Sequence, residues 1–243
     1  MSTLSRLHLD QPLAEGMELP GDPAAARYFG AVLRKAPGDP VLLFNARDGE
    51  FAATIAAVRK DQIRFAIGPR TRAPAPGPDL RLLLACLKRD AMEWAVEKAT
   101  ELGISRLQPV FTQRCVVTSL NLDRLRAIAR EAAEQSERLD MPQILPPAPL
   151  HRVLDGWDGS PILAAAERRD APPLAEALTG RSLPLALLVG PEGGFTGAEL
   201  DDVTRRPFVV TATLGPRILR AETAVVAALA VMQALAGDTR GGR

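Results

Sequence analysis

The chain is short of several residue types that define whole classes of protein. Its 243 residues include only two cysteines and two histidines, so neither a disulfide framework nor a zinc site is supported. No apolar run is long enough to span a bilayer, and charge and His8 interrupt the N-terminus before any signal-peptide core can form. We therefore expect a cytoplasmic protein without a membrane segment or a metal.

The chain also lacks a large excess of charge of either sign. The formal net charge is only +1, which excludes the global basic field of a non-specific DNA binder. Hydrophobic residues make up 47% of the chain, enough for a sizeable core in one large domain or two. Most of the cations are arginines, which suit bidentate phosphate contacts, although a GC-rich coding bias is the favoured explanation of their total number.

The first third of the chain reads as a small β-rich domain. Residues 22–39 predict a helix, opened by Asp22-Pro23 and ended by Pro37-Gly38. Three short apolar runs joined by tight turns follow between Val41 and Ile67, a pattern typical of an antiparallel meander. The proline-rich stretch from Arg70 to Asp79 then predicts a stiff linker, which places the domains at 1–72 and 78–243.

After the linker, strands and helices alternate. Strands are predicted over 80–87, 104–111, 161–167, 185–190 and 208–215, and helices over 90–103, 121–139 and 221–237. Asn121 or Asp123 opens the second of these helices. This alternation predicts an α/β domain with a parallel sheet covered by helices on both faces.

Two strand-to-loop junctions near the C-terminus carry the clearest chemical signal. "LLVGPEGGF" and "ATLGPRILRAETA" each run from a predicted strand into a Gly-Pro loop, and Thr196 and Glu199 form a capping box after the first. Ligands gather at the carboxyl ends of parallel strands, so the two loops predict one pocket. Neither loop is a dinucleotide fingerprint or a P-loop, which argues against NAD and ATP.

These stretches resemble the SPOUT-class RNA methyltransferases, specifically the ribosomal RNA small subunit methyltransferase E family. "EWAVEKATELGI", "FTQRC", "EAAEQSERLDMP" and "AARYFGAVLR" extend the resemblance over nearly the whole chain. It implies a PUA-like β-barrel that binds RNA, followed by a SPOUT α/β domain with a deep trefoil knot, a rare exception to unknotted folding. It further implies a homodimer that uses S-adenosyl-L-methionine (SAM) to methylate N3 of a uridine in 16S ribosomal RNA of the small subunit.

The resemblance and the local chemistry together assign residues to roles. Glycines let the main chain approach a planar adenine, and the second loop can supply N–H and C=O groups to its edge. Arg220 is expected to hold phosphate or the uracil oxygens, and Glu222 is either a general base or a helix cap. The expected cofactor-binding residues are Leu163, Val189, Gly190, Pro191, Glu192, Gly193, Gly194, Leu214, Gly215, Ile218, Leu219 and Arg220.

Further arginines are candidates for contacts with RNA. Arg114 and Arg138 match arginine positions of the family and either grip RNA or brace the dimer. Ala91 stands where these proteins usually carry a basic residue, which puts one local RNA contact in doubt. The full set of expected RNA contacts is Arg6, His8, Arg34, Arg114, Arg138 and Arg217.

Two other functions remain as alternatives. Ribose 2′-O methylation of ribosomal or transfer RNA uses the same fold class, but the PUA-like block and "LGPRILRAET" disfavour it. A non-catalytic RNA-binding assembly factor is disfavoured by the intact "GPEGG" and "LRAET" loops.

Overall fold

The computed structural model describes residues 4–165 and 171–240, and the chain forms two compact units. The first unit holds residues 1–76 together with 133–141, and the second holds 77–132 and 142–243. The short segment 133–141 thus belongs with the N-terminal unit, although the sequence pattern placed it inside the C-terminal domain.

The N-terminal unit is built on a five-stranded sheet with the order β1-β3-β4-β5-β2. The predicted meander is confirmed, because β3, β4 and β5 pair antiparallel in sequence order, while β1 joins β3 in parallel. Its elements are β1 (Arg6–His8), β2 (Glu18–Gly21), α1 (Pro23–Arg27), a π-helix (Tyr28–Val32), β3 (Pro40–Asn45), β4 (Gly49–Arg59) and β5 (Gln62–Arg72).

Three features of this unit differ from the sequence prediction. The helix expected over 22–39 is a five-residue α-helix that continues as a π-helix and ends at Val32. Strand β5 runs on to Arg72, so the linker begins later than Arg70. The short strands β1 and β2 were not predicted, because three or four residues are too few to show an alternating pattern.

A small aromatic and aliphatic core holds this unit together. Phe29 of the π-helix is completely buried and meets Phe65 of β5 edge to face, with ring centroids 5.8 Å apart. Leu43 and Ile55, which point inward from β3 and β4, belong to the same cluster. The inward-facing side chains of the meander and of the π-helix therefore share one core.

The second unit contains a seven-stranded sheet that is parallel, as predicted, although its two-residue strands β8 and β9 were not predicted. The strand order is β12-β10-β11-β6-β7-β8, with β9 also paired to β7. Its elements are β6 (Leu80–Ala85), α2 (Arg89–Glu101), β7 (Arg106–Phe111), α3 (Leu122–Gln135), β8 (Gln143–Ile144), β9 (Ala148–Pro149), α4 (Leu150–Asp155), β10 (Ile162–Ala165), α5 (Leu174–Ala177), β11 (Leu185–Val189), α6 (Gly197–Thr204), β12 (Val209–Ala212), α7 (Ala221–Ala236) and a final 3₁₀ turn (Asp238–Arg240).

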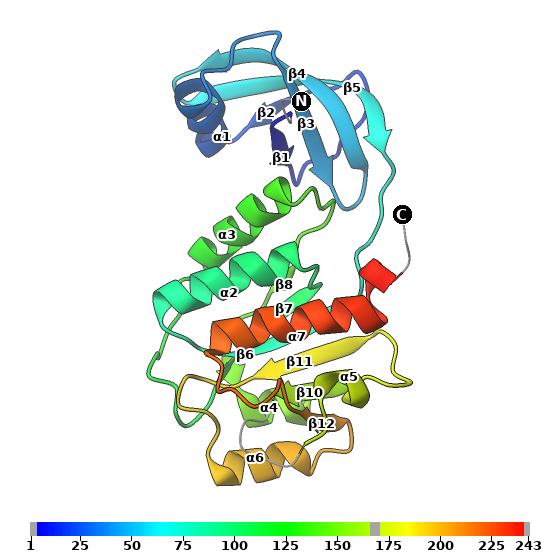
Figure 1. Cartoon of the computed structure of the whole chain (residues 1–243). Helices are drawn as coiled ribbons and strands as arrows, with labels where there is room; N and C mark the ends of the chain where they lie inside the picture. The colour runs from blue at the N-terminus through cyan, green and yellow to red at the C-terminus, as the bar shows by residue number, and fades with distance from the viewer. Residues whose placement is uncertain (1–3, 166–170, 241–243) are drawn as a thin grey trace. The chain divides into compact units, whose positions relative to one another are not determined.

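Helices cover both faces of this sheet. Figure 1 shows α2 and α7 side by side on one face and α4 and α6 on the other. Every residue of β6 and β11 is buried, which is why these strands read as continuous apolar runs in the sequence. The part of the predicted strand 161–167 that lies beyond Ala165 falls outside the described residues.

Local signals fixed several of these helix ends. Asn121 is confirmed as the cap of α3, because its side-chain oxygen accepts the main-chain N–H of Arg124 at 3.0 Å. The capping box of α6 is also present, with the Thr196 hydroxyl and the Glu199 carboxylate each accepting the other residue's main-chain N–H. The four- and six-residue helices α5 and α4 were missed, because so few residues carry no helical periodicity.

Candidate functional site

A pocket of about 590 Å³ opens at the carboxyl ends of three strands in the second unit. The loop after β11 and the loop after β12 form most of its wall. Its lining also includes Ala165 at the end of β10, Arg114 after β7, Leu200 of α6, and Ala221 and Ala224 of α7. The sequence predicted one pocket from these two loops as neighbours. The structure instead places β10 between β11 and β12, yet the two loops still line the same cavity.

The first loop, Gly190–Phe195, owes its shape to two of its glycines. A Cβ built at Gly190 would lie 2.9 Å from Cε2 of the Phe195 ring, so a side chain there would push the ring aside. Gly194 has a φ of +67°, which other residues adopt only with strain. A Cβ at Gly194 would meet no atom within 4 Å, so the space next to this glycine is open.

The second loop, Leu214–Leu219, presents main-chain groups to the pocket. It turns at Gly215, whose φ is +104° and whose N–H donates to the hydroxyl of Thr213 at 3.2 Å. Within the described part of the chain, the main-chain N–H groups of Leu214, Ile218 and Leu219 have no hydrogen-bond acceptor. Because all three residues line the pocket, these donors are available to a ligand.

Among the described residues, three arginines and one glutamate line the pocket, so this part of the wall has an excess of positive charge. Arg217 and Arg220 are exposed, and neither guanidinium has a hydrogen-bond or ion-pair partner among residues 4–165 and 171–240. Arg220 is the N-cap residue of α7, where its carbonyl accepts the N–H of Ala224 at 2.8 Å. Two unpaired guanidiniums beside open main-chain donors suit an anionic or oxygen-rich substrate.

The structure brings nearly all of the predicted cofactor-binding residues together. The exception is Leu163, which lies inside β10 and is fully buried, whereas Ala165 two residues later reaches the pocket. Glu222 lies in the first turn of α7 and is not among the described residues that line the cavity, whereas Glu192 does line it. Sequence reasoning missed Ala165 and Phe195, because alanine and phenylalanine in these positions look like ordinary core residues.

Two of the predicted RNA contacts, Arg6 and His8, need correction. The Arg6 side chain is only 3% exposed, pairs with Glu50 at 2.8 Å and lies over the Phe44 ring at 4.2 Å. Its guanidinium also donates to the carbonyls of Ala133, Glu134 and Arg138. His8 is buried too, with its ring against Phe44. Both side chains are therefore engaged inside the N-terminal unit and are not available to phosphate.

The other predicted RNA contacts fall into different environments. Arg34 is exposed, has a φ of +54° and lies two residues after the end of the π-helix. Arg138 is largely buried and pairs with Asp140 at 3.1 Å, which makes it a bracing residue within its unit. Arg114 lines the pocket, where its guanidinium donates to the carbonyl of Gly193 at 2.7 Å.

The two cysteines take no part in this wall. Cys86 is completely buried, and burial raises the pKa of its thiol to about 12, so it stays protonated and unreactive. Among the described residues no cluster of histidine, cysteine or carboxylate side chains has the arrangement of a metal site. None of the described helices is long and apolar enough to cross a membrane.

Comparison with known proteins gives a consistent result over the whole chain. Residues 74–233 match the model of an RNA methyltransferase domain, and residues 22–68 match that of an RNA methyltransferase PUA domain. Ribosomal RNA small subunit methyltransferase E of Rickettsia conorii is 32% identical over 95% of this chain and 96% of its own length. The protein of the same name from Bacillus subtilis is 31% identical over 83% and 84% of the two chains.

Solved structures agree with the sequence comparison. The Neisseria gonorrhoeae ribosomal RNA small subunit methyltransferase E, bound to S-adenosyl methionine, superposes with a TM-score of 0.89 at 29% identity and covers 97% of this chain and 99% of its own. A Legionella pneumophila protein in complex with the bound cofactor SAM gives a TM-score of 0.88 at 30% identity and the same coverage. With its matched domains, its coverage and its fold, the chain belongs to the ribosomal RNA small subunit methyltransferase E family.

Proposed function

We propose that this protein transfers the methyl group of SAM to N3 of a uridine in the 16S ribosomal RNA of the small subunit. The observation that carries the proposal is the pocket at the strand ends, with its open main-chain donors and unpaired arginines. Two relatives with the same fold over nearly their whole length are bound to SAM, and relatives from several bacteria carry the name of the 16S enzyme's family.

The pocket suits SAM in both size and chemistry. A cavity of about 590 Å³ lies within the usual range for a small-molecule site of about 300–1,000 Å³. The N–H groups of Ile218 and Leu219 would bind the adenine edge, and the open space beside Gly194 would admit the ribose. When bound, SAM supplies a methyl group activated by its positively charged sulfur.

The chain's own residues would hold the uridine and remove its N3 proton. Arg220, with Arg217 beside it in the same loop, would stabilise the negative charge that spreads over the uracil oxygens or grip the adjoining phosphate. Glu222 remains one candidate for the proton acceptor, and a capping role in the first turn of α7 is the alternative. Glu192 joins it as a second candidate, because it is the carboxylate among the described residues of the pocket wall.

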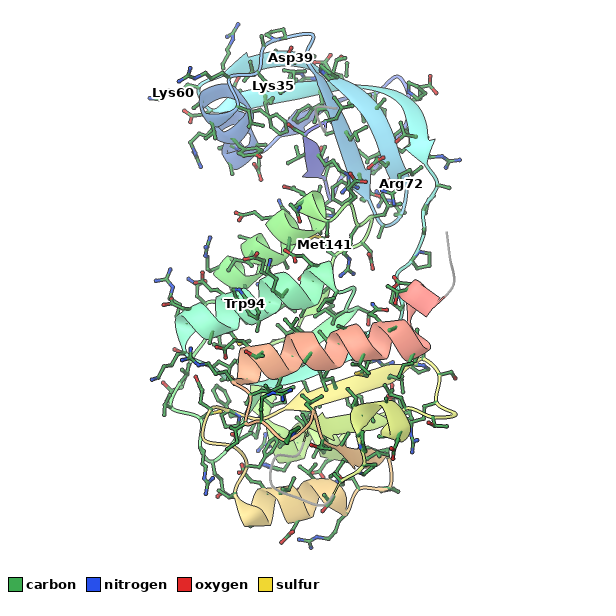
Figure 2. All side chains as sticks on the ribbon, in the orientation of Figure 1. Lys35, Asp39, Lys60, Arg72, Trp94 and Met141 are labelled. Atoms are coloured by element: carbon green, nitrogen blue, oxygen red, sulfur yellow. The ribbon has the colours of Figure 1, made fainter. Side chains whose placement is uncertain are left out.

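We assign RNA binding to the N-terminal domain, residues 1–72, and catalysis to residues 78–243. With Arg6 and His8 buried, the cations available to RNA on the first domain are surface residues. Figure 2 shows Lys35 and Lys60 at the same end of this domain, near Asp39, and Arg34 adjoins Lys35 in the chain. Arg34 and Lys60 are exposed and Lys35 is half-buried. Surface cations of this kind supply the phosphate contacts that position an RNA without reading its sequence.

We further propose a homodimer formed through α7. The buried side of this helix packs within its own unit, yet its other side remains apolar, with Val226, Val231 and Leu235 all at least partly exposed. A helix that is apolar on its outer side as well is expected to pack against another chain.

Two further expectations remain predictions. The deep trefoil knot is expected from the family, and activity on the ribosome would place the protein in the cytoplasm.

Two measurements test the proposed function. Calorimetry on the purified protein should detect SAM binding, and incubation of small subunits lacking the modification with labelled SAM should produce 3-methyluridine in 16S RNA. A 2′-O-methylated nucleoside would instead identify a ribose methyltransferase. SAM binding with no methylation of either free RNA or subunits would favour the non-catalytic assembly factor.

A further inference from the structure

The loop that follows β7 is attached to the first pocket loop at two points. Residues Thr112–Cys115 form a tight turn closed by a hydrogen bond from the N–H of Cys115 to the carbonyl of Thr112 at 3.1 Å. The thiol of Cys115 lies 3.4 Å from the N–H and 3.3 Å from the hydroxyl of Thr112, which ties the turn a second time. Gln113 and Arg114 occupy the two corner positions of this turn.

The first attachment is made by Arg114. Its guanidinium donates to the carbonyl of Gly193 at 2.7 Å and more weakly to that of Phe195 at 3.4 Å. A Cβ built at Gly193 would lie 3.4 Å from Cβ of Arg114, so the arginine stem packs directly against the loop backbone. A single side chain therefore holds the main chain on both sides of Gly194, the residue with the left-handed backbone.

The second attachment is made by the backbone of Gln113. Its N–H donates to the Glu199 carboxylate at 2.6 Å, and the other oxygen of that carboxylate accepts the N–H of Thr196 at 2.9 Å. Glu199 therefore serves the capping box of α6 and the β7 turn together. Both ends of residues 193–199 are fixed to the same four-residue turn.

We infer that Arg114 is a positioning residue that holds the Gly193–Phe195 backbone in its SAM-binding shape. The first pocket loop leaves the open space beside Gly194 that would admit the ribose, and it contains three glycines. Such a loop loses more conformational freedom on ordering than other sequences do. Without the two carbonyl contacts, the loop would be more mobile in the free protein and would become ordered only when SAM binds. The free-energy cost of that ordering would then be subtracted from the free energy of SAM binding. The inference rests on the proposed function, because it assigns the pocket to SAM.

The test compares Arg114→Ala with Arg114→Lys and with the control Arg126→Ala. Arg126 is also an exposed arginine of the second unit, but its hydrogen bond runs to Asp123 within α3. We expect Arg114→Ala to weaken SAM binding about tenfold by calorimetry, the range for losing one charge-assisted hydrogen bond. Lysine keeps the charge but not the planar fork, so it should recover part of the affinity, and Arg126→Ala should match the wild type.

Two further readouts separate positioning from general stability. Hydrogen exchange without SAM should show the amides of residues 192–199 exchanging about tenfold faster in Arg114→Ala, with the rest of the second unit unchanged. Steady-state kinetics should show a raised KM for SAM with kcat largely kept, because the Arg114 guanidinium is bonded to the carbonyls of Gly193 and Phe195. A raised KM for RNA with an unchanged KM for SAM would instead assign Arg114 to the RNA contact expected from the sequence and would overturn the positioning role.

The outcomes distinguish this inference from the proposed function. Unchanged SAM affinity and unchanged loop exchange in Arg114→Ala would overturn the role of Arg114 while leaving the methyltransferase proposal intact. A lower melting temperature with faster exchange throughout the unit would also overturn it, because the residue would then be merely structural. A wild-type protein that binds no SAM would refute both proposals, since the positioning role is defined toward that cofactor.

Discussion

Arg220 allows binding and chemistry to be separated in one variant. Its side chain is exposed, lines the pocket and has no hydrogen-bond partner in the described part of the chain. Its contribution to α7 comes from its main-chain carbonyl, which alanine retains. Arg220→Ala should therefore change the free energy of unfolding by no more than about 0.5 kcal/mol, as is usual for surface substitutions.

The effect on turnover should be much larger. Removing one preorganised donor to a developing negative charge typically costs about 100-fold or more in rate, equal to about 2.7 kcal/mol in activation free energy. SAM affinity should stay close to that of the wild type, because main-chain groups of the two loops are expected to hold the cofactor. Arg220→Lys should recover little, since a point charge cannot donate to two oxygens as a planar guanidinium does.

Melting temperature, SAM affinity and single-turnover methylation are to be measured on the same preparations. Arg205→Ala is the matched control, because Arg205 is also an exposed arginine of the second unit but bonds to the carbonyl of Asp201, away from the pocket lining. If Arg220→Ala lowered the melting temperature and SAM affinity together while the folded enzyme turned over normally, the catalytic assignment would be refuted.

Three other predictions concern the cofactor, acid stability and assembly. Gly194→Val should abolish SAM binding by calorimetry with the fold retained by circular dichroism, because the side chain would enter the open space and the φ of +67° would cost about 1–2 kcal/mol; unchanged affinity would move the cofactor elsewhere. The hydrogen bond from Arg81 lowers the pKa of the Asp158 carboxyl, so this pair stabilises the protein above about pH 4, and its contribution is lost as the pH falls further. In urea denaturation measured over a series of pH values, Asp158→Asn should therefore reduce the loss of unfolding free energy below about pH 4. Leu235→Asp on the outer side of α7 should convert the dimer to a monomer by light scattering, and a wild-type protein that methylates as a strict monomer at micromolar concentration would contradict the assembly.

Local sequence signals determined much of this protein. Asn121 and the Thr196–Glu199 box fixed helix starts, because a cap acts through hydrogen bonds to residues three positions away. The apolar runs of β6 and β11 indicated strands buried on both faces, and the order of strands and helices indicated a parallel sheet. The two Gly-Pro loops could also be recognised from the sequence, because each is a short contiguous stretch of the chain.

Only the tertiary structure decided which side chains are exposed and able to contact RNA or the cofactor. Arg6 looks in the sequence like any surface cation, but contacts 44 and more than 120 residues away bury it against Glu50 and the end of α3. The position of β10 between β11 and β12 and the attachment of Arg114 to Gly193 likewise depend on how distant strands pair. Such contacts come from the global packing of the chain, and the local periodicity and spacing of residues carry no information about that packing.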